Sequence, residues 1–316
     1  MAQRILITGG SGFVGQWLSR SLLQQGWIVF AGTIEGPLSP QLLSQKEIGA
    51  IRWLPLDISS DDDIARAVEK SAPDRVVHLA GIASPPEANA SPVRTFDINA
   101  LGAMRLLHHL AASRNRNARV LVIGSAEEYG AQPGPGPVSE TAPLWPLSTY
   151  ASSKASQELI ALQIFRSTGL QVICTRSFNH SGVGHGENYL LPALARRGSQ
   201  LPRTGGALHI GNGSPVRDYL HVSDVVNAYA LLLEKGTAGE VYNVSSGQGI
   251  SVRELAERVL KRVGVTADIS TDPALVRPID VPFLVGDNSK LRKTTGWKPE
   301  RTVDDIIGDL IHAASR

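Results

Sequence analysis

Two residues with complementary acid–base chemistry lie four positions apart in the segment TYASSK. Tyr150 and Lys154 share one face if this segment is helical, because residues four apart are neighbours on a helix. A phenol has a pKa near 10 and is a poor acid–base catalyst at neutral pH. A neighbouring ammonium stabilises the phenolate, so we expect Lys154 to lower the pKa of Tyr150 and make proton transfer possible.

A serine and two glutamates follow the apolar run RVLVIG, residues 119–124. The run predicts a buried strand, which places Ser125, Glu127 and Glu128 at its end. A carboxylate there can be a catalytic base or a solvated loop charge, and for Glu127 both interpretations stay open. Glu128 is predicted to be structural or solvated and to point away from Glu127 if the strand continues.

The segment ITGGSGFVG joins the first predicted strand to the first predicted helix. Gly9, Gly12 and Gly15 allow a tight turn, close approach of the backbone to a pyrophosphate, and close helix–strand packing. The N-terminus of the helix then faces the phosphates. The spacing therefore predicts a dinucleotide site, and we assign Phe13 and Val14 of the same loop to it.

Later strand ends extend this predicted cofactor site. Asp57 could accept a hydrogen bond from an adenine amino group, or it could be a turn or helix-capping aspartate. Thr33 stands where a carboxylate would select NAD, Glu35 follows two residues later, and no arginine is near to select NADP, so that preference stays open. Small and apolar residues suit close contact with the cofactor at three positions where the fourth strand ends and at one position after Asp57: Leu79, Ala80, Gly81 and Ile58.

Strands that alternate with helices must position these residues. Apolar, β-branched runs predict strands at 4–8, 27–32, 52–56, 75–80, 119–124 and 171–176. Helical patterns predict helices that include 13–25, 61–70, 95–114 and 150–168. This alternation predicts an α/β fold with a doubly wound parallel sheet.

The regular alternation ends near residue 178. We expect a dinucleotide-binding domain at 1–178, with some later segments packing back on it, and a smaller mixed substrate-binding lobe at 179–316. A strand in the segment EVYNVSS, residues 240–246, is expected within the smaller lobe.

Composition excludes several classes of protein. The chain has 316 residues, 42% of them apolar, and a net charge of +2, which gives no electrostatic footprint for nucleic acid. No apolar run is long enough to span a membrane, and no signal-peptide pattern precedes the first strand. The single cysteine, Cys174, is expected to be buried and suits a reducing compartment, so a cytoplasmic location is predicted.

His180 and His185 share a loop, but no cluster of ligands completes a metal site, and no metal is expected.

Taken together, the glycine loop, Ser125 and the Tyr150–Lys154 pair resemble the extended short-chain dehydrogenase/reductase family over essentially the whole chain. The resemblance implies a Rossmann fold, NAD or NADP as cofactor, and Tyr150 as the acid–base. It also implies that Ser125 donates a hydrogen bond to the substrate and that Lys154 is the electrostatic partner of Tyr150. Asn99, in the segment FDINALG, is implied in organising the cofactor site or its helix.

The C-terminal half narrows the resemblance. The segments RSFNHSGVGHGENYLLP and GNGSPVRDYLHVSDVVNAY are similar to those of GDP-mannose 4,6-dehydratases and of the shorter GDP-4-keto-6-deoxy-D-mannose reductases. This similarity implies a nucleotide-sugar substrate, a homodimer formed through a four-helix bundle, and Asn179, Arg217 and Arg277 as ligands of the diphosphate and ribose. Guanidinium groups pair well with phosphate, although Arg217 could instead form a salt bridge with the adjacent Asp218.

Three departures from the family pattern remove no catalytic group. The segment HSGVGHG lacks the usual proline, Thr149 replaces a common proline, and Ala126 stands where many relatives have a second hydroxyl.

Four functions remain open at this point. A reductase would deliver hydride from NAD(P)H to carbon 4 of the sugar, with Tyr150 protonating the oxygen. A 4,6-dehydratase would need a further base, for which Glu127 is placed, and an epimerase would return hydride to the opposite face. A non-catalytic dinucleotide-binding regulator would often lack the tyrosine or lysine that this chain keeps. The reductase is favoured because the chain is short and the segment IEGPLSPQLLS lacks the arginines that the dehydratases carry there.

Overall fold

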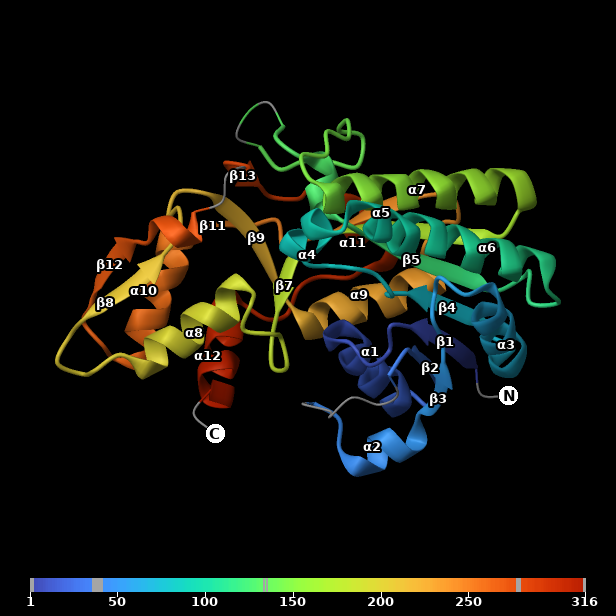
Figure 1. Ribbon diagram of the computed structural model, residues 1–316, viewed down its shortest axis with the longest axis horizontal. Helices are drawn as coiled ribbons and strands as arrows, with labels where there is room; N and C mark the ends of the chain where they lie inside the picture. Colours follow the sequence, from blue (N-terminus) through green and yellow to red (C-terminus); the bar gives the residue numbers. More distant parts are fainter. Residues whose placement is uncertain (1–2, 36–41, 133, 135, 277–279, 315–316) are drawn as a thin grey trace.

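The computed structural model describes residues 3–314 except 36–41, 133, 135 and 277–279. Its centre is a seven-stranded parallel sheet in the order β10-β6-β5-β4-β1-β2-β3 (Figure 1). The strands are β1 (Arg4–Thr8), β2 (Ile28–Thr33), β3 (Arg52–Pro55), β4 (Arg75–His78), β5 (Arg119–Ser125), β6 (Gln171–Ser177) and β10 (Val241–Val244). The predicted doubly wound α/β fold is confirmed.

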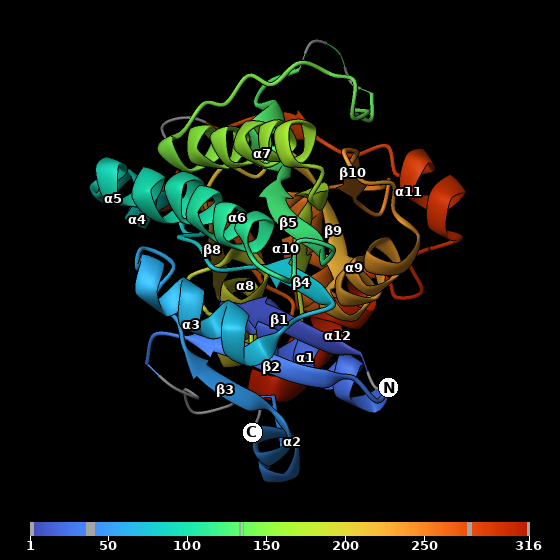
Figure 2. The ribbon, with the colours of Figure 1, turned by 90° about the vertical axis from the view of Figure 1, so that its right-hand side faces the viewer.

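Helices cover both faces of this sheet because its strands are apolar on both sides. Along β1, Ile5 and Ile7 belong to one core, and Leu6, which points to the opposite face, belongs to the other. The first core packs under α1 (Phe13–Gln24), α9 (Val222–Lys235) and α11 (Ser289–Thr295). The second packs under α3 (Asp61–Ser71), α6 (Gly102–Ala112) and α7 (Thr149–Thr168), as Figure 2 shows.

The helix predicted at 95–114 is interrupted. It consists of α5 (Pro92–Phe96), a π-helical turn η1 (Asp97–Leu101) and α6. The wide turn contains Asn99, which is fully buried and hydrogen-bonded to a loop and to α7. Periodicity alone does not reveal such a turn, because tertiary hydrogen bonds fix it. The remaining elements on this side of the chain are α2 (Gln45–Ala50), α4 (Pro85–Ala90) and the 3₁₀ helix η2 (Ala126–Tyr129).

A smaller lobe lies beside the carboxyl end of the sheet, on the left of Figure 1. Its own core joins α8, α10 and α12 to β8 and β9, with Leu194, Leu255 and Ile306 fully or almost fully buried. The elements are β7 (Asn179–Ser181), α8 (Leu190–Gln200), β8 (Ala207–Ile210), β9 (Val216–His221), β11 (Gly249–Ser251), α10 (Val252–Val263), β12 (Asp268–Thr271), η3 (Pro273–Leu275), β13 (Phe283–Leu284) and α12 (Val303–Ala314).

The segment EVYNVSS does not join the smaller lobe. It forms β10, the edge strand of the large sheet, where Val241 aligns with Cys174 and Asn243 with Arg176 of β6. Helix α9 likewise returns to pack on α1 and β5. The chain therefore crosses more than once between the two parts, and the domain boundary at residue 178 stays a prediction. No helix among the described residues is long and apolar enough to cross a membrane.

Candidate active site

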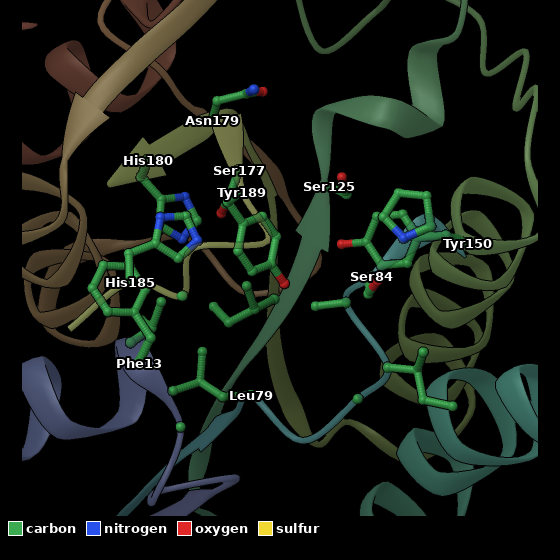
Figure 3. Close-up of a pocket in the computed structure, with 18 of the residues that line it drawn as sticks. Phe13, Leu79, Ser84, Ser125, Tyr150, Ser177, Asn179, His180, His185 and Tyr189 are labelled. Carbon is green, nitrogen blue, oxygen red and sulfur yellow. The ribbon is translucent and has the colours of Figure 1, made fainter. Parts of the chain in front are cut away.

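A cavity of about 890 Å³ lies at the carboxyl ends of the central strands and extends to the smaller lobe. Ligands of open α/β sheets bind at this edge, because helix N-termini and loops converge there. Figure 3 shows the cavity with Phe13, His185 and Tyr189 on one side and Ser125, Tyr150 and Ser84 on the other. Every predicted site residue in the described part of the chain except Asn99 lines this cavity or is buried beside it.

The glycine loop between β1 and α1 can hold a dinucleotide. Gly9 has φ +66°, and a Cβ there would lie 2.9 Å from the backbone nitrogen of Ala80. A Cβ on Gly15 would lie 2.6 Å from the carbonyl oxygen of Gly9, so only glycine permits this close packing. Helix α1 starts after Gly12 without a side-chain cap in the described structure, so its first N–H groups face the cavity for a phosphate.

The other predicted cofactor residues line the same cavity: Phe13, Val14, Thr33, Asp57, Ile58, Leu79, Ala80 and Gly81. Thr33 exchanges a hydrogen bond with Ser11 of the glycine loop (3.0 Å between hydroxyls). Asp57 accepts hydrogen bonds from the backbone and hydroxyl of Ser59 at 2.8 and 2.7 Å, which lowers the pKa of its carboxyl. Its carboxylate thus shapes a turn and also borders the cavity, so the two interpretations of Asp57 are compatible.

Asn99 fastens the loop after β4 to α7. Its Oδ1 accepts from the backbone N–H of Ile82 (2.7 Å), and its Nδ2 donates to the Ile82 carbonyl (3.0 Å) and to Ser153 (2.9 Å). A Cβ on Gly81 would lie 2.9 Å from Asn99 Oδ1, so the loop passes very close to this amide. Asn99 therefore organises the cavity wall from behind.

Ser125, Tyr150 and Lys154 meet where β5 ends and α7 begins. Ser148 caps α7 by accepting from the Ala151 N–H (3.1 Å), which starts the helix just before Tyr150. The side chain of Ser125 lies close enough to Tyr150 to influence the pKa of its phenol, and both residues line the cavity. Lys154 is buried and its Nζ donates to the carbonyl oxygen of Ile123 (2.9 Å) and to Gln157 (2.8 Å).

The electrostatics of this pair differ from the expectation. Burial raises the pKa of Tyr150, as does the charge of Glu127, while the side chain of Ser125 acts in the opposite direction. Burial also lowers the pKa of Lys154 to about 8. The protein residues alone therefore do not lower the pKa of Tyr150, because desolvation disfavours both charged forms and Lys154 bonds to a strand carbonyl. The role of Lys154 as the electrostatic partner of Tyr150, together with a nicotinamide cation, stays a prediction.

The two glutamates after Ser125 occupy different environments. Strand β5 ends at Ser125 and the chain turns into η2, so the expected alternation of a continued strand does not apply. Glu127 is half-buried and lines the cavity close to Tyr150. Glu128 is completely buried behind it and is structural rather than solvated.

The smaller lobe contributes the predicted substrate ligands. Asn179 and Arg217 line the cavity. Arg217 forms an ion pair with Asp280 and donates to the Val281 carbonyl (2.6 Å). Asp218, the partner considered from the sequence, is fully buried and accepts hydrogen bonds from the backbone N–H groups of the loop 246–247. Arg277 lies outside the described residues.

Sequence reasoning missed a stack of three rings that spans the cavity wall. The His185 ring stacks on Phe13 (4.5 Å between centroids) and on Tyr189 (4.2 Å), and it exchanges a hydrogen bond with Ser181 (3.0 Å). Burial lowers the pKa of His185 to about 3, so the ring is neutral. No spacing in the sequence predicts this stack, because Phe13 comes from the glycine loop and Tyr189 from the smaller lobe. No cluster of three or more metal-ligating side chains occurs in the described part of the chain.

This fold and site define an extended short-chain dehydrogenase/reductase. The chain belongs to the GDP-mannose 4,6 dehydratase family, whose family model matches residues 6–310. It is thus an NAD(P)-dependent enzyme of the class that acts on nucleotide sugars.

Known relatives cover almost the whole chain. The GDP-6-deoxy-D-mannose reductase of Pseudomonas aeruginosa is 35% identical over 98% of this chain and 97% of its own length. The dTDP-glucose 4,6-dehydratase of Streptomyces niveus is 31% identical over 98% of this chain and 91% of its own. Among solved structures, RMD from Pseudomonas aeruginosa complexed with NADPH matches with a TM-score of 0.83 and 31% identity, over 99% of each chain.

Proposed function

We propose that the protein reduces the 4-keto group of a nucleotide-linked 6-deoxyhexose, most specifically GDP-4-keto-6-deoxy-D-mannose to GDP-6-deoxy-D-mannose (D-rhamnose). The observation that carries this proposal is that Ser125, Tyr150 and Lys154 line one cavity with the glycine loop. The similarity to a GDP-6-deoxy-D-mannose reductase supports the choice of sugar.

The residues of the chain divide the work of carbonyl reduction. When bound along the glycine loop, the reduced nicotinamide cofactor supplies the hydride. Tyr150, like any phenol, holds its proton at neutral pH, and it gives that proton to the carbonyl oxygen at carbon 4. Ser125 donates a hydrogen bond to the same oxygen, and Lys154 supplies positive charge near the phenolate that remains.

The nucleotide part of the substrate occupies the side of the cavity formed by the smaller lobe. Arg217 and Asn179 border this region, and Arg217 can pair with a diphosphate if it exchanges its contact with Asp280. We assign Arg277 the same role on the basis of the sequence resemblance.

A second candidate function is a nucleotide-sugar 4,6-dehydratase. The position of Glu127 favours it, since the carboxylate lines the cavity close to Tyr150 and could remove a proton from carbon 5. An epimerase is a third option.

Product analysis by mass spectrometry distinguishes these functions. GDP-mannose is incubated with the protein and oxidised cofactor, and the 4-keto-6-deoxy derivative with NADH and with NADPH. The proposal expects a product two mass units heavier from the keto sugar and none from GDP-mannose. Loss of water from GDP-mannose would establish the dehydratase, and cofactor binding without turnover of any sugar would establish a regulator.

We also infer a homodimer formed through α6 and α7. Large apolar side chains are exposed on this side of the molecule, namely Val93 on α5 (85% exposed), Leu159 on α7 (61%) and Leu101 on η1 (38%). Figure 2 shows α5, α6 and α7 side by side at the outer surface. Packing α6 and α7 against the same pair of a second copy would cover these side chains in a four-helix arrangement. A cytoplasmic location stays a prediction from the sequence.

A further inference from the structure

Glu128 is a buried carboxyl group that the proposed reaction does not use. Its side chain is 0% exposed, on the 3₁₀ helix directly after Ser125. Its Oε1 accepts a hydrogen bond from the backbone N–H of Ser125 at 2.6 Å. Its Oε2 has no hydrogen-bond partner among the described residues and lies 3.9 Å from Nε of Arg176. Burial of a carboxyl group costs folding free energy when one of its oxygens lacks a hydrogen-bond partner.

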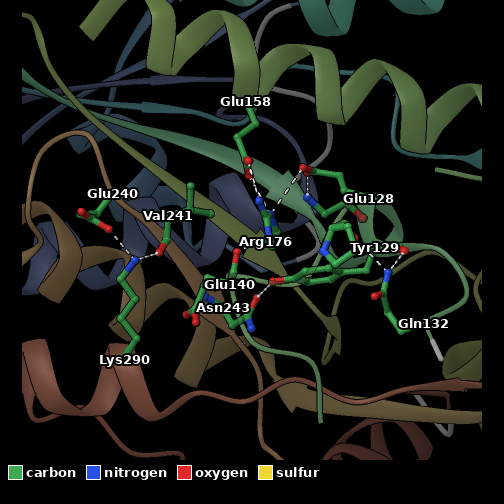
Figure 4. Close-up of polar contacts among 12 residues, drawn as sticks. Glu128, Tyr129, Gln132, Glu140, Glu158, Arg176, Glu240, Val241, Asn243 and Lys290 are labelled. Carbon is green, nitrogen blue, oxygen red and sulfur yellow. Dashed lines mark hydrogen bonds and ion pairs between the residues drawn. The ribbon is translucent and has the colours of Figure 1, made fainter. Parts of the chain in front are cut away.

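Arg176 does not satisfy Glu128 because Glu158 already holds it. The guanidinium donates to both carboxylate oxygens of Glu158 at 2.9 and 2.7 Å and covers the ring of Tyr129 at 4.7 Å, as Figure 4 shows. Arg176 also donates to the Glu140 carbonyl oxygen (3.1 Å), so Glu128 is a second carboxyl group beside a cation whose hydrogen bonds go elsewhere. Space for it is made at Gly124, where a Cβ would lie 2.5 Å from Glu128 Oε1.

Glu128 and Lys154 bind the same end of β5, since Glu128 accepts from the Ser125 N–H and Lys154 Nζ donates to the Ile123 carbonyl at 2.9 Å. The negative charge of Glu128 raises the pKa of Lys154 and adds to the rise in the pKa of Tyr150. Its own pKa is raised to about 8, first by burial and then by Glu158, while the Ser125 N–H, Arg176 and Lys154 oppose this rise. The charged forms of Glu128 and Lys154 thus stabilise each other, so the protonation of one depends on that of the other.

We propose that Glu128 is a positioning residue that fixes Ser125 through its backbone N–H and stabilises the ammonium group of Lys154 at the same strand end. This inference rests on the Ser125–Tyr150–Lys154 site of the proposed function. It adds a fourth residue, which acts through the other three and does not touch the substrate.

The other titratable groups around the pair do not replace Glu128. Tyr150 and Glu158 approach it from α7, and Cys174 and Arg176 from β6. The charge of Lys154 also reaches His78 on β4, whose pKa burial lowers to about 3, so that this ring is neutral in the relevant range. In the described structure, Glu128 is the carboxylate whose charge raises the pKa of Lys154.

The sign of the effect is fixed. As the pH rises towards and beyond 8, Glu128 loses its proton, and the new negative charge stabilises the ammonium of Lys154. In Glu128→Gln the hydrogen bond from Ser125 can persist but the charge cannot form. Lys154 then loses its proton at a pH about one unit lower. A nearby opposite charge typically shifts a pKa by about 1–3 units, and we expect the smaller value.

Nuclear magnetic resonance tests this without any substrate. The protein is labelled with ¹³Cε-lysine, the Lys154 signal is assigned by its absence from Lys154→Arg, and it is titrated in wild type and Glu128→Gln. We expect the midpoint of Lys154 to fall by about one pH unit in Glu128→Gln. An unchanged midpoint overturns the electrostatic role of Glu128.

Glu158→Gln is the matched control, since it removes a carboxylate from the same buried cluster. Glu158 raises the pKa of Glu128, so Glu128 ionises earlier in this variant. The midpoint of Lys154 should stay or rise, and a fall equal to that of Glu128→Gln would mean that any lost buried charge has the effect. If Glu128→Gln does not fold, Glu128→Asp keeps the charge and must keep the midpoint of Lys154 near that of wild type.

Turnover tests the positioning of Ser125. The shorter side chain of Glu128→Asp should lose the contact with the Ser125 N–H, so kcat should fall roughly tenfold with KM little changed. A kcat equal to that of wild type overturns this role. The two proposals can fail separately. A wild-type protein that does not reduce the keto sugar contradicts the reductase assignment, whereas the lysine titration needs no substrate and tests Glu128 alone.

Discussion

At the scale of single residues, Tyr150 is the proposed proton donor. A phenol that holds its proton at neutral pH suits an acid that protonates a carbonyl oxygen. Tyr150→Phe keeps the ring and removes that proton, so we expect turnover to fall by ~10²–10⁴, the usual contribution of a positioned acid. Steady-state rates with the keto sugar check this, and calorimetric titration with NADPH should show cofactor affinity within a few-fold of wild type. Turnover close to that of wild type would show that another group supplies the proton.

Glu127 borders the cavity, and its effect depends on the reaction. Reduction needs one hydride and one proton, and Tyr150 supplies the proton, so Glu127→Gln should cost a reductase about tenfold or less. A dehydratase would lose ~10²–10⁴ because the base for carbon 5 is gone. The assay compares wild type and variant in deuterated water. If wild type forms a water-loss product with deuterium at carbon 5 and the variant does not, the reductase assignment is wrong.

Arg217 lines the cavity and is proposed to bind the nucleotide, although it is paired with Asp280 in this structure. Arg217→Ala should weaken binding of the nucleotide sugar by roughly 1.5–3 kcal/mol, the value expected for a hydrogen bond to a charged group. KM should therefore rise, with little change in kcat. Arg217→Lys keeps the positive charge but lacks the planar guanidinium group, so its KM should lie between those of wild type and Arg217→Ala. An unchanged KM in Arg217→Ala would leave the residue as a partner of Asp280 only.

At the scale of elements, the turn between β1 and α1 carries the cofactor site. A Cβ on Gly12 meets only the Gly9 carbonyl oxygen, at 3.3 Å, so the fold should tolerate a side chain that the pyrophosphate cannot. Gly12→Val should therefore abolish measurable cofactor binding by calorimetry while the melting temperature changes little. Gly49→Val is the control, since a Cβ there meets nothing within 4 Å and α2 is remote from the cavity. Normal affinity in Gly12→Val would refute the site.

At the scale of the whole molecule, the exposed apolar side chains on α5, η1 and α7 point to a second copy. Replacing Val93 and Leu159 by glutamate should convert a dimer into a monomer, because charges would be buried at the contact. Sedimentation velocity measures the oligomeric state, and the double variant should keep its cofactor affinity. A monomeric wild type at micromolar concentration would exclude this interface.

Local sequence patterns by themselves determine much of this protein. The alternation of apolar strands and helices specifies the doubly wound sheet, because the chain must bury both faces of its parallel strands. The spacing of Gly9, Gly12 and Gly15 and the interval between Tyr150 and Lys154 are properties of one turn and one helix, so sequence separation alone locates them. These features depend on neighbours within a few residues.

Only the tertiary structure decides the features that join distant segments. It takes Val241–Val244 into the large sheet, turns η2 inward so that Glu128 is buried beside Arg176, and pairs Arg217 with Asp280. It also raises the pKa of Tyr150, where the sequence alone predicts a lowered value, because desolvation depends on everything packed around the ring. Contacts between residues far apart in the chain do not produce a periodic pattern in the sequence. They are therefore determined by tertiary packing and cannot be predicted from residue spacing.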